Sequence, residues 1–109
     1  MSRTIQHQII ARALELVWNE NTWARGAVAR GTDAVPCAPM DTRAVRFCAV
    51  GALQRAAGEL FGAHQAVERA ALTEAFVLTA NASLIELPAV NDLEGRQAVV
   101  DMFCVALAF

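Results

Sequence analysis

Apolar residues recur at helical spacing in three stretches of the chain. In residues 4–19, Ile5, Ile9 and Val17 keep helical spacing, while Arg12 lies among the polar positions and Thr4 stands where a cap is expected. A helix is also predicted over about residues 63–80. The last helix is predicted over residues 92–109, because apolar residues recur there at three and four and Asp92 can cap its start.

The stretch 43–58 has a different pattern, because its middle is almost unbroken apolar sequence. Such a run with small residues inside it is typical of a buried central helix and not of a surface helix with one apolar face. Gly51 costs about 1 kcal/mol of helix propensity relative to alanine, so we expect it to allow close packing of a neighbouring helix. Asp41 or Thr42 is expected to cap this helix.

Helical spacing is absent from residues 24–40, which contain two glycines and two prolines. Two short apolar pieces, 27–29 and 34–35, flank a segment in which Gly31 and Asp33 favour a turn. We predict a small hairpin or an irregular loop here. The fold expected for residues 1–109 is therefore a mainly α, compact single domain of about four helices, with a short β-hairpin or irregular loop between the first two helices.

Composition argues against a membrane protein and against a disulfide framework. No stretch long enough to span a membrane lacks a charged residue. The first residues show no apolar segment followed by a small-residue cleavage site, so no secretory signal is expected. The three cysteines (Cys37, Cys48 and Cys104) are an odd number at wide spacing, which favours reduced thiols and a cytoplasmic location.

The sequence contains no recognisable catalytic, metal-binding or cofactor-binding motif. His7 and His64 each lack a second histidine or cysteine three or four residues away. The glycine spacings match neither a phosphate-binding loop nor a dinucleotide-binding motif. Cys37 lies between two prolines, and Arg30 or Arg43 could stabilise its thiolate. We expect no catalytic residue, no metal, no cofactor and no enzymatic activity.

Charge is unevenly distributed along a chain whose net charge is −2. Residues 25–55 contain five arginines and two aspartates, whereas residues 56–109 contain seven acidic residues and two arginines. The two parts could pair within one molecule, or the basic part could face an acidic partner. Nucleic acid is not the expected partner, because no helix-turn-helix pattern is present. The guanidinium binds carboxylates and phosphates bidentately, so the predicted partner-binding residues are Trp23, Arg25, Arg30, Arg43, Arg46 and Asp92.

Three short motifs carry a family resemblance that covers nearly the whole chain. They are W-x-x-G-A-x-A at Trp23–Ala29, A-V-R-F-C-A-V-G-A-L at Ala44–Leu53 and V-N-D at Val90–Asp92. Their order and spacing resemble a family of small uncharacterised proteins found in bacteria and their phages, and C-A-x-G-A-L is the most specific part. That family often has a second aromatic residue where this chain has Val90. The resemblance implies a mainly helical domain that stands alone, and it brings no established activity.

We therefore expect a non-enzymatic protein-interaction module. The occurrence of the family in phages suggests an inhibitor of a host defence system, comparable to an anti-CRISPR protein, whose partner would be a host defence component. The apolar tail 106–109 either packs on the domain or forms a homodimer through the C-terminal helix. The alternative is a small-ligand or nucleotide-binding protein, or an enzyme, with a pocket lined by Trp23, Arg25, Arg43, Arg46 and Asp92.

Overall fold

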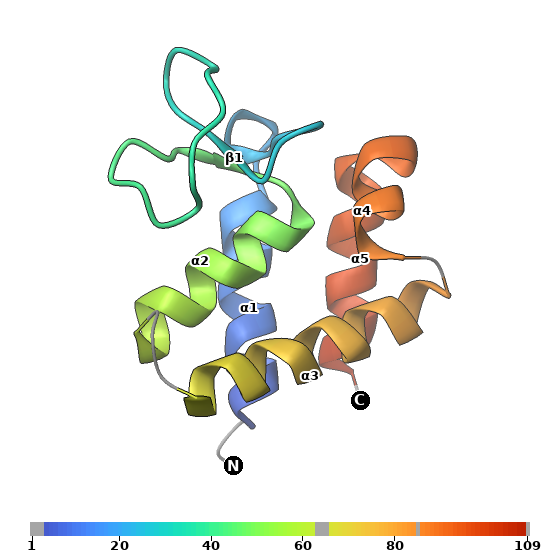
Figure 1. Ribbon diagram of the computed structural model, residues 1–109. Helices are drawn as coiled ribbons and strands as arrows, with labels where there is room; N and C mark the ends of the chain where they lie inside the picture. Colours follow the sequence, from blue (N-terminus) through green and yellow to red (C-terminus); the bar gives the residue numbers. More distant parts are fainter. Residues whose placement is uncertain (1–3, 63–65, 85, 109) are drawn as a thin grey trace.

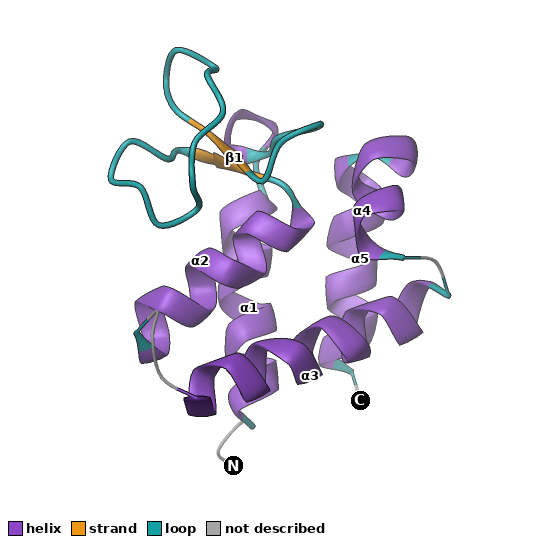
Figure 2. Ribbon diagram, in the orientation of Figure 1, coloured by secondary structure: helices purple, strands orange, loops and turns teal. Residues whose placement is uncertain are grey.

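The computed structural model describes residues 4–62, 66–84 and 86–108 (Figure 1). Most of this part of the chain is helical, and one small two-stranded sheet lies among the loops (Figure 2), which confirms the mainly α class. The described residues form five α-helices and not about four, but α4 is a turn of three residues. The elements are α1 (Ile5–Val17), the 3₁₀ turn η1 (Glu20–Thr22), β1 (Ala29–Arg30), β2 (Arg46–Phe47), α2 (Ala49–Phe61), α3 (Ala66–Ser83), α4 (Leu87–Ala89), the π-helical turn η2 (Val90–Glu94) and α5 (Arg96–Leu107).

The core forms around α1, which contacts α2, α3 and α5. The side chains of Ile9, Ile10, Leu53 and Phe103 are fully buried there. Thr4 caps α1 as predicted, because its hydroxyl oxygen accepts a hydrogen bond from the third following backbone N–H, at 3.2 Å. In Figure 1, α3 crosses one end of the helical layer, and the loops between α1 and α2 cover the other end.

The central helix begins later than the sequence predicts. It starts at Ala49, and neither Asp41 nor Thr42 caps it. The cap is Cys48, whose Sγ accepts a hydrogen bond from the backbone N–H of Gly51 at 3.3 Å. Residues 43–47 are not helical because their backbone groups bond elsewhere: the N–H of residue 45 donates to the carbonyl oxygen of residue 30, and residues 46–47 pair with β1.

The small sheet joins different segments from those that the sequence predicts. The strands β1 and β2 are antiparallel, with Ala29 opposite Phe47 and Arg30 opposite Arg46. The predicted partner, residues 34–35, is not a strand, but the chain turns back there as predicted. The N–H of Gly31 donates to the carbonyl oxygen of Val35 at 3.1 Å, the N–H of Cys37 donates to that of Ala29 at 3.0 Å, and Pro36 forms an isolated antiparallel bridge with Arg30. We refer to residues 24–47 as the loop layer.

The C-terminal helix also begins later than predicted. Asp92 lies within η2 and does not cap α5, which starts at Arg96 after Gly95 with a positive φ of 92°. The predicted third helix corresponds to α3, although residues 63–65 lie outside the described residues, as does Phe109 at the predicted end of the last helix.

In the part of the chain that the structure describes, no single helix has the length and apolar character needed to cross a membrane. A bent pair, Arg69–Ser83 with Leu87–Glu94, meets these criteria only when the two pieces are taken together.

Candidate functional site

The loop layer, α2 and η2 meet at the side chain of Asn91, which is 1% exposed. Its Oδ1 accepts hydrogen bonds from the indole Nε1–H of Trp23 at 2.8 Å and from the backbone N–H of Ala49 at 2.9 Å. Its Nδ2 donates to the carbonyl oxygen of Ala24 at 3.0 Å and to Oδ1 of Asp92 at 2.9 Å. All four hydrogen-bonding positions of the amide are used, so Asn91 fixes the three segments relative to one another.

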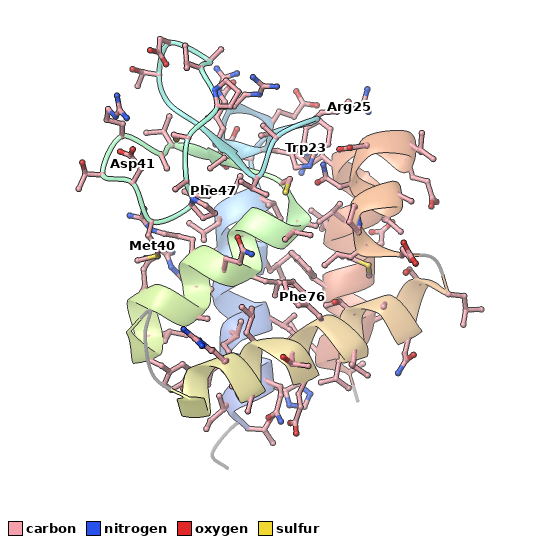
Figure 3. All side chains as sticks on the ribbon, in the orientation of Figure 1. Trp23, Arg25, Met40, Asp41, Phe47 and Phe76 are labelled. Atoms are coloured by element: carbon pink, nitrogen blue, oxygen red, sulfur yellow. The ribbon has the colours of Figure 1, made fainter. Side chains whose placement is uncertain are left out.

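We refer to Asn91 and its four hydrogen bonds as the hub. Asp92 is one of the four partners of the Asn91 amide and is held as a carboxylate. The hydrogen bond from the Asn91 amide lowers its pKa most, and the N–H of Gly26, which donates to Oδ1 at 3.1 Å, lowers the pKa further. The charge of Arg25 acts in the same direction. The guanidinium of Arg25 lies over the indole ring of Trp23, 5.3 Å from the ring centroid (Figure 3). Three of the six predicted site residues, Trp23, Arg25 and Asp92, are therefore neighbours.

Arg30 has a structural role within the loop layer. Its Nη1 donates to the carbonyl oxygen of Ala34 at 2.8 Å, and its Nη2 donates to that of Arg25 at 3.2 Å. These bonds close the turn that begins after β1 and tie it to the segment that carries Arg25. Both terminal nitrogens of Arg30 thus donate to backbone carbonyl oxygens of the loop layer.

Arg43 and Arg46 differ in their surroundings. Arg43 is exposed and forms an ion pair with Asp41, with 2.9 Å between Nη2 and Oδ2. The hydrogen bond from Arg43 lowers the pKa of Asp41 to about 2. Arg46 is exposed and makes no hydrogen bond or ion pair with any described residue. The predicted arginine group therefore does not form one continuous face: Arg30 and Arg43 have intramolecular partners, whereas the guanidinium of Arg46 points to no partner in this part of the chain.

Apolar side chains on the outside of the loop layer were not among the predicted site residues. Val28, Val35, Met40 and Val45 are each more than a third exposed, with Val35 at 56%. The turn residues and prolines around these side chains mark the segment as irregular. Without helical spacing, the sequence does not show which of its apolar residues are buried and which are exposed. Asn91 was also missed as a site residue. Its signal was a single amide within the apolar segment 87–93.

A hollow of about 270 Å³ lies beside Asp92 and also has Cys48 in its lining. Burial raises the pKa of the Cys48 thiol, and the charge of Asp92 acts in the same direction. The hollow therefore combines a neutral thiol with an ionised carboxylate, which is not a pairing of nucleophile and base. Within the described ranges, no three His, Cys, Asp or Glu side chains come close enough together to hold a metal ion.

These observations define a mainly helical domain with an irregular loop layer that a buried asparagine joins to the helices. The chain belongs to a family of unknown function, DUF6197, whose model matches residues 1–108. No curated protein and no solved structure matches it.

Proposed function

We propose that this protein is a non-enzymatic protein-interaction module that binds an acidic partner protein through the outer surface of the loop layer. The observation that carries the proposal is the composition of this surface. Four apolar side chains that are more than a third exposed (Val28, Val35, Met40 and Val45) and four arginines lie along residues 24–47. Arginine and methionine are enriched in protein–protein interfaces.

The loop layer is also held in one arrangement before any partner binds. Asn91 anchors its beginning, Arg30 closes its turn, and its backbone approaches α2 closely at Gly51. A Cβ at Gly51 would lie 1.7 Å from the carbonyl oxygen of Val28. A surface that is already ordered loses little conformational entropy on binding, which favours affinity.

Charge supports an acidic partner. Arg25 and Arg46 form no ion pair with a described residue, and Arg43 could exchange Asp41 for a carboxylate of the partner. The resemblance to proteins of bacteria and phages suggests an acidic host defence component as this partner, so that the protein would act as an inhibitor in the cytoplasm, where its three cysteines would stay reduced.

Nucleotide binding at the predicted Trp/Arg pocket has less support. The hollow beside Asp92 includes that carboxylate in its lining, but it includes neither Trp23 nor any arginine. An ionised carboxylate repels a phosphate, and no guanidinium in this lining would offset the repulsion.

The experiment compares Arg46→Glu with Asn81→Glu, which also places a carboxylate on the surface. Arg46 is exposed and its guanidinium makes no hydrogen bond or ion pair within the described residues, whereas Asn81 is exposed near the end of α3 and belongs to neither the loop layer nor the pocket that residues 38–40 line. Tagged proteins are used for pull-downs from the native host, and light scattering gives the mass of each complex. We expect the wild type and Asn81→Glu to retain one stoichiometric acidic partner and Arg46→Glu to lose it, with unchanged circular dichroism. Equal recovery with both variants would contradict the proposal.

Light scattering of the purified protein tests self-association separately. Val105 is 46% exposed on α5, so a dimer that Val105→Glu dissociates would identify α5 as a homodimer surface. A monomer at all concentrations would rule out this role for α5.

A further inference from the structure

We propose a second binding site, for a small apolar carboxylate such as a medium-chain fatty acid, in the pocket between the loop segment 38–40, α2 and α3. We refer to it as the α2–α3 pocket. Its volume is about 320 Å³, at the small end of the range for ligand sites. Its lining includes Pro39, Met40, Gln54, Gly58, Arg69 and Leu72. This site shares Met40 with the outer surface of the loop layer but has a different arginine, Arg69 and not Arg46.

The wall formed by the loop segment is fixed in place by the protein itself. Nη1 of Arg55 donates to the carbonyl oxygens of Pro39 at 2.9 Å and Asp41 at 3.2 Å. The same guanidinium lies 5.8 Å from the centroid of the Phe47 ring. The pocket therefore exists without a ligand, which lowers the entropic cost of binding.

Met40 and Gly58 give this wall its shape. A Cβ at Gly58 would lie 2.4 Å from Sδ of Met40, so the absence of a side chain at Gly58 lets Met40 lie directly against α2 (Figure 3). Met40 is 43% exposed, and its unbranched side chain can adjust to a ligand. The backbone of this wall is therefore fixed, while the apolar side chain of Met40 can adjust. It faces a surface of α2 formed by Ala57 and Gly58.

The charge of the pocket selects an anion. The guanidinium of Arg69 is exposed and makes no hydrogen bond or ion pair within the described part of the chain. The nearby carboxylate of Glu59 is already paired with Arg12, at 3.1 Å, and with Arg55, at 3.7 Å. The Arg69 guanidinium beside apolar side chains is complementary to a carboxylate on an apolar tail. None of the described residues that line the pocket carries an aromatic ring on which a base could stack, which argues against a nucleotide.

The test uses octanoate as the probe, with octanol as its uncharged counterpart. Calorimetric titration of the full chain is expected to give a dissociation constant for octanoate of about 1 mM or below, within the range of small-ligand efficiencies. Octanol should bind at least about tenfold more weakly, because it lacks the charge–charge contact with Arg69. Equal affinity for octanoate and octanol would show that the pocket does not recognise an anion.

Two variants separate the contributions of charge and shape. Arg69→Gln should weaken octanoate binding about tenfold and leave octanol binding unchanged. Ala38→Trp, at an exposed position of the pocket wall, should abolish binding of both compounds while the circular dichroism stays that of the wild type. Octanoate binding that neither variant alters, or no heat of binding for the wild type, would overturn the proposal. Arg46→Glu should bind octanoate normally, so failure of this site can be distinguished from failure of the interaction surface.

Discussion

Replacement of Asn91 by alanine tests whether the buried amide holds the fold together. The substitution removes all four hydrogen bonds at once, and three of the partners lie at buried or half-buried positions. These partners are the indole N–H of Trp23, the backbone N–H of Ala49 and the carbonyl oxygen of Ala24. The fourth partner, the carboxylate of Asp92, is exposed, so water can replace the amide there.

The expected loss of stability follows from these contacts. A buried polar group left without a partner costs about 1 kcal/mol or more, so three such groups predict a loss of about 3 kcal/mol in the free energy of unfolding. Trp23→Phe removes only the indole donor, while Oδ1 of Asn91 still accepts from Ala49, so we expect a loss of about 1 kcal/mol. In the double variant no indole N–H is left unpaired, so its loss should be about 1 kcal/mol smaller than the sum of the two single losses.

Urea denaturation followed by far-UV circular dichroism measures these free energies, and a constant denaturant slope shows that unfolding stays two-state. Asn81→Ala is the matched control, because Asn81 is exposed on α3 and should change stability by no more than about 0.5 kcal/mol. If Asn91→Ala lies within about 1 kcal/mol of the wild type, or the two hub substitutions are strictly additive, the hub does not carry the energy assigned to it.

Three further predictions address other parts of the structure. Gly51→Ala should destabilise by about 3 kcal/mol in the same urea assay, because its Cβ would meet the backbone carbonyl of Val28; an unchanged midpoint would refute the close contact. Cys48→Ser should change stability by no more than about 1 kcal/mol, because serine is a good N-cap and offsets the burial of its hydroxyl; a large loss would show that the thiol acts only as an apolar group. Folding lowers the pKa of Asp92, so its contribution is present above its unfolded pKa of about 4 and is lost as pH falls through the lower folded value. Asp92→Asn should therefore flatten the acid side of the stability curve, and a curve parallel to that of the wild type would contradict this role.

Local patterns in the sequence predicted those helical features that depend on the residues of a single helix. The residues of the last helix that recur at three and four, including Val99, Met102, Phe103 and Ala106, are buried in α5 as expected. The cap at Thr4 is confirmed for the same reason. In both cases the signal depends on residues within one or two helical turns, which the sequence displays directly. Close packing at Gly51 is also confirmed, but the segment that approaches it is the loop at Val28 and not a helix.

The start of α2 could not be predicted in this way. An unbroken apolar run is compatible with a buried strand as well as with a buried helix, and periodicity does not separate the two. Phe47 belongs to a strand because Ala29 lies opposite it, 18 positions earlier in the chain. Cys48 is the cap because it stands between the end of this strand and the first residue of α2.

The site was predictable only in part, because its contacts join distant segments. The Trp23 indole and Asn91 are 68 residues apart, and Ala49 and Asn91 are 42 residues apart. Asp92 has the chemistry of a helix cap, yet its oxygen accepts from Gly26 in the loop layer. A local pattern identifies an acceptor but does not reveal which donor the fold brings to it.

The hub also explains what the three motifs of the resemblance have in common. Trp23 belongs to the first motif, Ala49 to the second and Asn91 to the third, and the hydrogen bonds of one amide connect them. Gly51 in the second motif approaches the backbone of Val28 in the first. The motifs thus specify how the loop layer is joined to the helices. Val35, Met40 and Arg69 lie outside the motifs, whereas Val28, Val45 and Arg46 lie within them. The motifs therefore contribute part of the proposed partner surface as well as its attachment to the helices.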